Sequence, residues 1–207
     1  YGGRLHGPAR VDPGLGVRDV CDEALLLARV APTWIARDRR AGVAAAVASG
    51  AAAVVLDDGL QDPSLAWDLA LLVVDGGQGF GNGRVIPAGP LREPAARALA
   101  RADAIVLVGP DDAGLGHRLA DKPVLRGTLE PTIELFDLAD RPVLAFAGIG
   151  RPAKFFAMLR RLGLDVAATA SFADHHVYDE DEVMRLVERA ARLGARPVTT
   201  EKDAVRL

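Results

Sequence analysis

The sequence is poor in several features that would each define a protein class. Its 207 residues contain one cysteine, Cys21, which excludes a disulfide framework and a cysteine-based zinc cluster and favours a reducing, cytoplasmic setting. No apolar run approaches the roughly 18–20 residues that cross a bilayer. The net charge of −3 leaves no basic surface of the kind that binds nucleic acid, so no nucleic-acid partner is expected.

A phosphate loop of the form G-x-x-x-x-G-K-[ST] is also absent from these residues. The stretch GIGRPAK at 148–154 lacks that spacing, and Lys154 falls inside an expected helix, which favours a glycine-rich turn between strand and helix. The glycines at 76–83 are followed by Arg84-Val85-Ile86-Pro87 rather than by a helix. That context excludes a dinucleotide-binding fingerprint and predicts a tight loop.

What the sequence does contain is an alternation of short apolar runs and helical patterns. Half of the residues are hydrophobic, enough for a sizeable core. The alternation predicts an α/β fold with mostly parallel strands. The expected strands cover 33–36, 51–56, 69–74, 104–108, 143–147, 165–170 and 197–200. The expected helices cover 19–30, 39–50, 93–102, 152–162 and 180–193, with Asp38 and Asp179 as N-caps and Gly163 and Gly194 as stops.

The composition turns polar and irregular around residues 111–141, which predicts a boundary near Ala139–Pro142. We therefore expect two domains, a core domain over residues 1–139 and a smaller α/β domain over residues 140–207. The chain begins at Tyr1 rather than at a methionine and stops just after an apparent strand and a charged turn. These ends predict a piece of a longer protein.

The first candidate site is the acidic pair Asp57-Asp58, which follows the apolar run AAAVVL at 51–56. A run without a polar face is typical of a strand buried on both sides of a parallel sheet, and such strands deliver their C-terminal residues to a ligand crevice. Adjacent carboxylates repel each other unless a cation or a proton lies between them. The pair therefore indicates a Mg²⁺-phosphate site, while an Asp-Gly turn formed with Gly59 remains an alternative.

Other candidates are weaker when taken alone. Arg92 could clamp a phosphate, although a role in capping a helix near Glu93 is equally open. Asp174-His175-His176 follows an expected strand and suits proton transfer or metal binding, against a purely structural histidine. Composition alone makes Asp22 an ordinary acid of a first helical turn. It likewise makes residues 199–203 (TTEKD) an exposed polar turn.

Taken together and in order, these stretches make the chain resemble the bacterial tetraacyldisaccharide 4′-kinase family of lipid A biosynthesis. No single stretch is specific, whereas eight in one order are, and they span essentially the whole chain. The matching stretches are YGG at 1–3, DEALLLA at 22–28, LDDGLQ at 56–61, GFGNG at 79–83, PAGPLREP at 87–94, AFAGIG at 145–150, FADHH at 172–176 and TEKD at 200–203.

The resemblance implies a phosphate-loop NTPase-like parallel sheet with helices on both faces, plus the smaller C-terminal α/β domain. It also implies transfer of the γ-phosphate of ATP to the 4′-hydroxyl of a tetraacylated glucosamine disaccharide 1-phosphate. By resemblance, Asp22 and His175 form the pair that deprotonates that hydroxyl. The remaining site residues fall near Mg²⁺ and the phosphates (Asp57, Asp58 and Glu93) or among phosphate and substrate contacts (Arg39, Arg92 and Asn82).

The same resemblance implies ATP and Mg²⁺ as cofactors, and a lipid substrate met at the cytoplasmic face of the bacterial inner membrane. In the family the phosphate loop precedes the Tyr-Gly-Gly stretch, so we expect this chain alone to be inactive and not to bind ATP detectably. Cys21 stands where the family usually has glycine, and Ala24 where it often has proline. Two other functions remain alternatives: a Mg²⁺-dependent phosphohydrolase with Asp57 as nucleophile, and a non-catalytic nucleotide-fold binding module.

Overall fold

The computed structural model describes residues 3–12, 14–116, 119, 121–130, 138 and 140–207. Contacts between residues divide the chain into two compact units. Unit 1 comprises Tyr1–Ala51 with Pro131–Leu207, and unit 2 comprises Ala52–Glu130. Both units contain a three-stranded parallel sheet with helices, which confirms the predicted α/β class.

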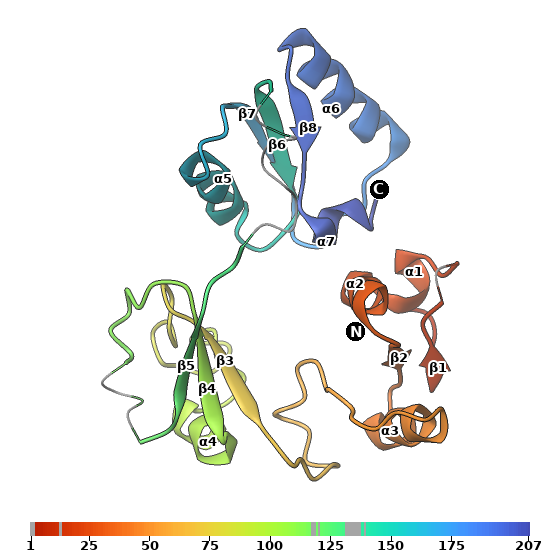
Figure 1. The fold of residues 1–207 in the computed structure, drawn as a ribbon, viewed down its shortest axis with the longest axis vertical. Coiled ribbons are helices and arrows are strands. Elements are labelled where there is room, and N and C mark those ends of the chain that lie inside the picture. The colour runs from red at the N-terminus through yellow and green to blue at the C-terminus, as the bar shows by residue number, and fades with distance from the viewer. Residues whose placement is uncertain (1–2, 13, 117–118, 120, 131–137, 139) are drawn as a thin grey trace. The chain divides into compact units, whose positions relative to one another are not determined.

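The sheet of unit 1 has the order β7-β6-β8, with β6 (Val143–Ala147) between β7 (Val166–Ser171) and β8 (Arg196–Val198). All five residues of β6 are buried because helices cover both faces of the sheet, as Figure 1 shows. One face of β6 packs on α5 (Pro152–Arg161), and the other packs on α6 (Glu180–Arg192). A strand covered in this way needs no polar face, which explains the continuous apolar sequence VLAFA.

Local signals in the sequence set the ends of several helices. The Asp38 side chain accepts a hydrogen bond from the backbone N–H of Arg40 at 2.9 Å and caps α3 (Arg39–Ala48). Asp179 and Glu182 form a reciprocal capping box at the start of α6. Both predicted caps are confirmed.

The helix predicted over residues 19–30 is two helices, α1 (Val17–Val20) and α2 (Asp22–Val30). Cys21 separates them with a φ of 67° and a ψ of 160°, a backbone conformation that no right-handed helix contains. The prediction of one helix is therefore wrong, and the break places Asp22 at the first position of α2. A short antiparallel pair, β1 (Ala9–Arg10) with β2 (Trp34–Ile35), lies in the same unit.

The sheet of unit 2 has the order β3-β4-β5 and all its strands are parallel. The strands are β3 (Leu71–Asp75), β4 (Ala104–Val108) and β5 (Val124–Gly127), and α4 (Ala95–Arg101) precedes β4. One face carries a core that includes Val74, Ile105 and Leu107. On the other face Val73 is 64% exposed and Leu125 is 53% exposed. The strand predicted over residues 69–74 is thus buried on one side only.

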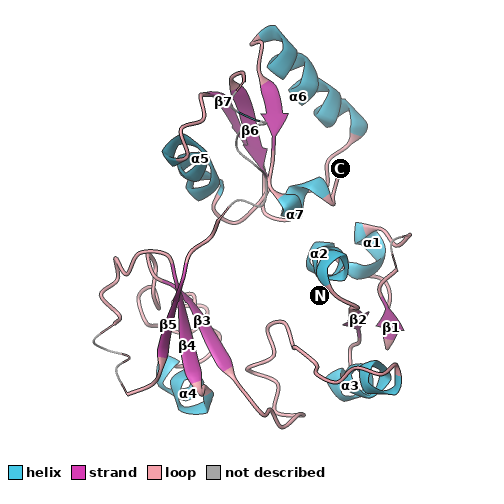
Figure 2. Ribbon diagram, in the orientation of Figure 1, coloured by secondary structure: helices cyan, strands magenta, loops and turns pink. Residues whose placement is uncertain are grey.

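The strand predicted over residues 51–56 is wrong. No strand is assigned there, and a long loop connects α3 to β3 in Figure 2. Val55 is 94% exposed and Val54 is 39% exposed. A strand requires a hydrogen-bonded neighbour, and within the described part of the chain no strand pairs with these residues.

The chain continues beyond β8 into a short helix, α7 (Glu201–Ala204), which Thr200 caps by accepting a hydrogen bond from the backbone of Asp203. This segment was predicted to be an exposed turn, and that prediction is wrong for Asp203, which is fully buried. α7 contacts α2, so residues 1–51 pack with the C-terminal residues.

Units 1 and 2 differ from the two predicted domains, which cover residues 1–139 and 140–207. The residue at the predicted boundary, Ala139, lies outside the described residues. That division stays a prediction for the longer protein.

No helix of the described ranges combines the length and the apolar character that crossing a membrane requires.

Candidate active site

Two of the predicted site residues meet in unit 1. Asp22, at the first position of α2, has a side chain that is 3% exposed. Its Oδ2 lies 3.1 Å from Nδ1 of His175, 153 positions further along the chain. Its Oδ1 accepts a hydrogen bond from the backbone N–H of Glu23 at 3.0 Å. The structure thus joins the acid and the histidine that the resemblance paired.

His175 projects from the loop that follows β7. Its backbone N–H donates to the carbonyl of Gly148 at 3.1 Å, which ties the loop to the end of β6. Its φ of 58° is left-handed, a conformation that is uncommon outside glycine and that is found most often where surrounding contacts enforce it. The side chain is 54% exposed. His175 is therefore held on its Asp22 side and accessible on the other.

The neighbouring His176 has a structural environment. Its Nε2 lies 2.8 Å from Oε2 of Glu182, and its ring stacks on Phe172 with centroids 4.9 Å apart. The hydrogen bond from His176 is the largest of the causes that lower the pKa of the Glu182 carboxyl. The two histidines thus face different partners and do not act as one metal-binding pair.

Arg206 belongs to this site although no sequence pattern predicts it there. Its side chain is 1% exposed, and its Nε donates to Asp22 Oδ2 at 2.7 Å. Its Nη1 donates to the carbonyl of Gly148 at 2.7 Å and lies 3.2 Å from Oδ1 of Asp203. Its Nη2 lies 2.5 Å from the same Asp22 oxygen without the alignment of a hydrogen bond. The only available signal was one arginine between apolar residues at the end of a polar turn.

Asp203 anchors the other side of Arg206. Its Oδ1 accepts hydrogen bonds from the backbone of Gly148 and from the hydroxyl of Tyr178, each at 2.9 Å. Its Oδ2 accepts from the hydroxyl of Thr200 at 2.6 Å. Burial, followed by the hydrogen bond to Asp203, raises the pKa of the Tyr178 hydroxyl, which therefore remains a donor. No local pattern predicts the burial of Asp203, because two of its partners, Gly148 and Tyr178, come from segments 55 and 25 positions away.

The surroundings of Asp22 fix its charge. Burial by itself raises the pKa of a carboxyl group, and it is the largest single influence on Asp22. Hydrogen bonds from Glu23 and Arg206, together with the positive charges of Arg206 and Lys202, outweigh it and hold the pKa of Asp22 well below its ordinary value. Asp22 is consequently a carboxylate at neutral pH, and a carboxylate oxygen can only accept a hydrogen bond, here from the Nδ1–H of His175.

In unit 2, two loops bring the other predicted acids close to basic groups. Asp58, in left-handed conformation with a φ of 53°, forms an exposed ion pair with Arg92. The Glu93 carboxylate pairs with Arg101 and accepts a hydrogen bond from Nε2 of Gln61 at 3.1 Å. The bond from Arg101 is the main cause that lowers the pKa of Glu93. Residues 58–61 and 92–101 thus form one charged cluster.

The structure also places the predicted contact residues Asn82 and Arg39. Asn82 closes its loop, because its Nδ2 donates to the carbonyl of Ala88 at 2.9 Å while its Oδ1 accepts from the backbone of Arg84 at 3.0 Å. Arg39 is the first residue of α3 and is half-buried in unit 1.

The predicted metal ligands Asp57, Asp58 and Glu93 do not form a three-ligand cluster. Over the described ranges, the only such group with ligand atoms within 4.8 Å of one another is Cys21, Asp22 and Glu23. Arg206 and His175 already bind Asp22, and Lys202 Nζ lies 2.6 Å from Oε1 of Glu23. The acids of the Cys21-Asp22-Glu23 group are therefore part of an ion-pair network between the start of α2 and the C-terminal residues Lys202 and Arg206.

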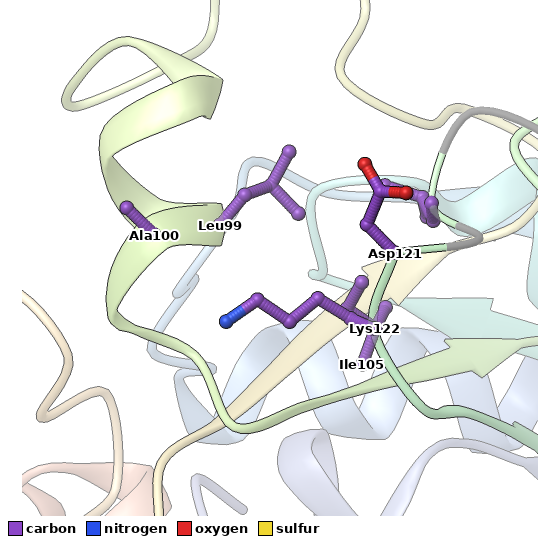
Figure 3. A pocket seen from close by; sticks show the side chains of 6 residues that line it. Leu99, Ala100, Ile105, Asp121 and Lys122 are labelled. Carbon is purple, nitrogen blue, oxygen red and sulfur yellow. The ribbon is translucent and has the colours of Figure 1, made fainter.

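A small pocket of about 170 Å³ lies in unit 2, between α4 and the segment around Lys122. Figure 3 shows that Leu99, Ile105, Asp121 and Lys122 line it. The Lys122 amine donates to the carbonyl of Ala102 at 2.7 Å, so it satisfies the end of α4. Nucleotide-sized ligands need pockets of roughly 300 Å³ or more. None of the predicted site residues lines this pocket, which is a packing gap.

The fold and the Asp22–His175 pair define an α/β protein with the side-chain arrangement of general base catalysis. The family model described as tetraacyldisaccharide-1-P 4′-kinase matches residues 1–207. The tetraacyldisaccharide 4′-kinases of Rhodospirillum centenum and Parvibaculum lavamentivorans are 58% and 52% identical over the whole chain. The chain belongs to the tetraacyldisaccharide-1-P 4′-kinase family, which confirms the resemblance.

A solved structure shares the fold. The crystal structure of LpxK from Aquifex aeolicus in complex with ATP matches the whole chain with a TM-score of 0.75 and 26% identity, over 67% of that protein's chain. The chain spans 62% of the length of the relatives from R. centenum and P. lavamentivorans.

Proposed function

We propose that the protein containing this chain transfers the γ-phosphate of ATP to the 4′-hydroxyl of a tetraacylated glucosamine disaccharide 1-phosphate. The observation that carries this proposal is the 3.1 Å contact between His175 Nδ1 and Asp22 Oδ2. An alcohol is a weak nucleophile, so a positioned base that removes its proton during attack accelerates the transfer. Family membership favours this reaction over phosphate hydrolysis or simple binding.

The roles within the pair follow from the charge of Asp22. Because Asp22 is a carboxylate, it holds the proton of His175 on Nδ1 and leaves Nε2 as the proton acceptor. The His175 side chain is 54% exposed, and the substrate hydroxyl would bind at its exposed edge, away from Asp22. Asp22 orients the ring and stabilises the imidazolium that forms when the proton is taken up.

The charged cluster of unit 2 supplies the second part of the proposal. Mg²⁺ in phosphoryl-transfer sites is usually held by one or two carboxylates together with substrate phosphates and water, and Asp57 and Asp58 offer such hard oxygen ligands. Bound there with ATP, Mg²⁺ would neutralise charge on the phosphates. Arg92 would exchange its ion pair with Asp58 for a phosphate contact. Glu93 would keep Arg101 in place, and Arg39 and Asn82 remain proposed contacts.

The lipid nature of the proposed substrate places the reaction at a membrane surface. We infer that the intact protein meets its substrate at the cytoplasmic face of the bacterial inner membrane. Because both partners of the phosphate transfer are anionic, the arginines of the site would offset repulsion between them.

The test uses the intact protein, radiolabelled ATP and the tetraacylated disaccharide 1-phosphate in detergent micelles. The wild type should place label on the 4′-hydroxyl, as shown by mass spectrometry of the product. His175→Ala should lower kcat by about 10²-fold or more. Arg192→Met, which removes an exposed arginine paired with Glu188, is the matched control and should keep the wild-type rate. A wild-type rate for His175→Ala would refute the assignment, and release of free phosphate alone would indicate a phosphohydrolase.

A further inference from the structure

We propose that Arg206 is a positioning residue for the Asp22–His175 pair, whose guanidinium holds the Asp22 carboxylate in the place and charge state that orient the histidine. This inference rests on the proposed function. It assigns a role to a residue near the end of the chain that no sequence pattern marked.

The first observation is that Arg206 and His175 share one oxygen. Arg206 Nε and His175 Nδ1 approach Asp22 Oδ2 at 2.7 and 3.1 Å. Both donors come from the C-terminal stretch of unit 1, whereas Asp22 comes from its N-terminal stretch. The other oxygen of Asp22 accepts the backbone N–H of Glu23. The carboxylate cannot rotate without breaking bonds at both oxygens. Its orientation, and hence that of the His175 ring, depends on Arg206.

The second observation is that Arg206 is fixed independently of Asp22. Asp203 Oδ1 and the carbonyl of Gly148 both bind its Nη1. That same carbonyl accepts the backbone N–H of His175 at 3.1 Å. A single peptide group therefore fixes both the guanidinium and the backbone of the histidine, so the distance between them is set by one rigid element, the end of β6.

The third observation concerns charge. Asp22 and Arg206 are both buried, and a buried carboxylate requires a compensating cation. Arg206 supplies that cation at contact distance, whereas Lys202 bonds to Glu23. With its charge retained, Asp22 keeps the proton of His175 on Nδ1. The charged and titratable groups around the pair, from every element that packs on it, are Cys21, Glu23, Asp174, His176, Tyr178, Glu182, Lys202, Asp203 and Arg206.

Two substitutions separate the geometry of Arg206 from its charge. Arg206→Lys keeps a positive charge but has no planar fork to bind Asp22, Asp203 and Gly148 together. Arg206→Met removes the charge while keeping much of the volume. Because the methionine variant leaves two buried carboxylates without a cation, it is the one that can fail to fold, and the lysine variant then carries the test alone. Arg192→Met is the control for loss of an exposed arginine.

The experiment combines steady-state kinetics of the intact protein, over a range of pH, with ¹⁵N NMR of the histidine side chains, which reports the tautomer of His175. We expect Arg206→Lys to lower kcat at least about tenfold with an unchanged KM for ATP. It should also reduce the Nδ1–H tautomer of His175. Arg206→Met should in addition move the acid limb of the pH–rate profile upward by roughly one pH unit, because an uncompensated carboxylate favours the imidazolium.

Two results would overturn the proposal. One is wild-type kcat, pH profile and His175 tautomer in Arg206→Lys. The other is a loss of thermal stability in which the protein that stays folded keeps the wild-type profile and tautomer, since that pattern describes a purely structural arginine. If the intact wild-type protein transfers no phosphate, the proposed function fails, and the NMR comparison still decides whether Arg206 controls the tautomer.

Discussion

The backbone N–H of Gly148 donates a 2.9 Å hydrogen bond to Oδ1 of Asp203, 55 positions further along the chain. A methyl group on Gly148 would lie 3.0 Å from the carbonyl oxygen of Ala173 and from Cβ of His176, and 3.1 Å from the Asp203 oxygen. Such distances are tighter than ordinary packing contacts. Because Gly148 has no side chain, the end of β6 can pack closely against both α7 and the loop after β7 that carries His175.

Gly148→Ala should shift the loop that carries His175. We expect a loss of about 1–2 kcal/mol in the free energy of unfolding, because the added methyl overpacks a closed site. We also expect kcat to fall at least about tenfold, because the pair would be misaligned. Gly127→Ala is the matched control, since a methyl there has no atom within 4 Å. Equal kcat for the two variants would show that the loop tolerates the added group.

Asp22 should make the stability of the protein depend on acid pH. Its pKa is lower in the folded chain than in the unfolded chain, so the folded state binds this proton less readily. The stabilisation is fully present above the ordinary value of 3.8 and is lost as the pH falls through the lower folded value. Urea unfolding of wild type and Asp22→Asn should differ by about 2 kcal/mol at pH 7. The difference should shrink steadily below about pH 4, whereas a constant difference down to pH 2 would contradict the ion-pair explanation.

Cys21 should be a site of backbone strain. Its φ of 67° and ψ of 160° lie in a region that is nearly restricted to glycine and costs other residues about 1–3 kcal/mol. Cys21→Gly should therefore raise the free energy of unfolding by about 1 kcal/mol, after the greater flexibility of glycine in the unfolded chain is subtracted. Cys21→Ala keeps the strain and should not stabilise. Chemical denaturation of the two variants makes the comparison, and stabilisation by both would point to the thiol instead.

Neighbouring valines of β3 should respond very differently to truncation. Val74 is 5% exposed in the core of unit 2, whereas Val73 is 64% exposed on the opposite face. Val74→Ala should cost about 2 kcal/mol of stability, and Val73→Ala should stay within about 0.5 kcal/mol. Similar losses in thermal or urea unfolding would mean that the Val73 face is covered in solution.

The elements predicted best from the sequence are those whose cause is local or fully enclosed. The strands at Ala104–Val108 and Val143–Ala147 have the predicted bounds, because each apolar run forms the central strand of its sheet and has a hydrogen-bonded neighbour on both sides. Asp38 and Asp179 cap their helices through hydrogen bonds to residues two and three positions away. The run at 51–56 has the same composition, but a strand also needs a neighbour, which a local pattern does not specify.

The candidate site was less predictable for a related reason. The role of Asp22 came from the family resemblance alone, since a first-turn acid has an ordinary helical explanation. Asp203 and Arg206 were missed because burial of a charged residue depends on its partners, and Arg206 meets Asp22 across 184 positions. The pattern TEKD nevertheless has a physical explanation in the structure: Thr200 caps α7, Lys202 binds Glu23 and Asp203 anchors Arg206.

The separation between Asp22 and Arg206 also sets an order of events during biosynthesis. Asp22 leaves the ribosome before unit 2, and unit 2 is made in full before the strands of the β7-β6-β8 sheet appear. Folding proceeds largely in the order of synthesis, so unit 2 can form while residues 1–51 still wait for their partners. The buried acid gains its cation only when residue 206 emerges. Until then Asp22 stays hydrated and residues 1–51 lack the partner that allows this acid to be buried, so the growing chain carries an incompletely folded segment that is open to chaperones.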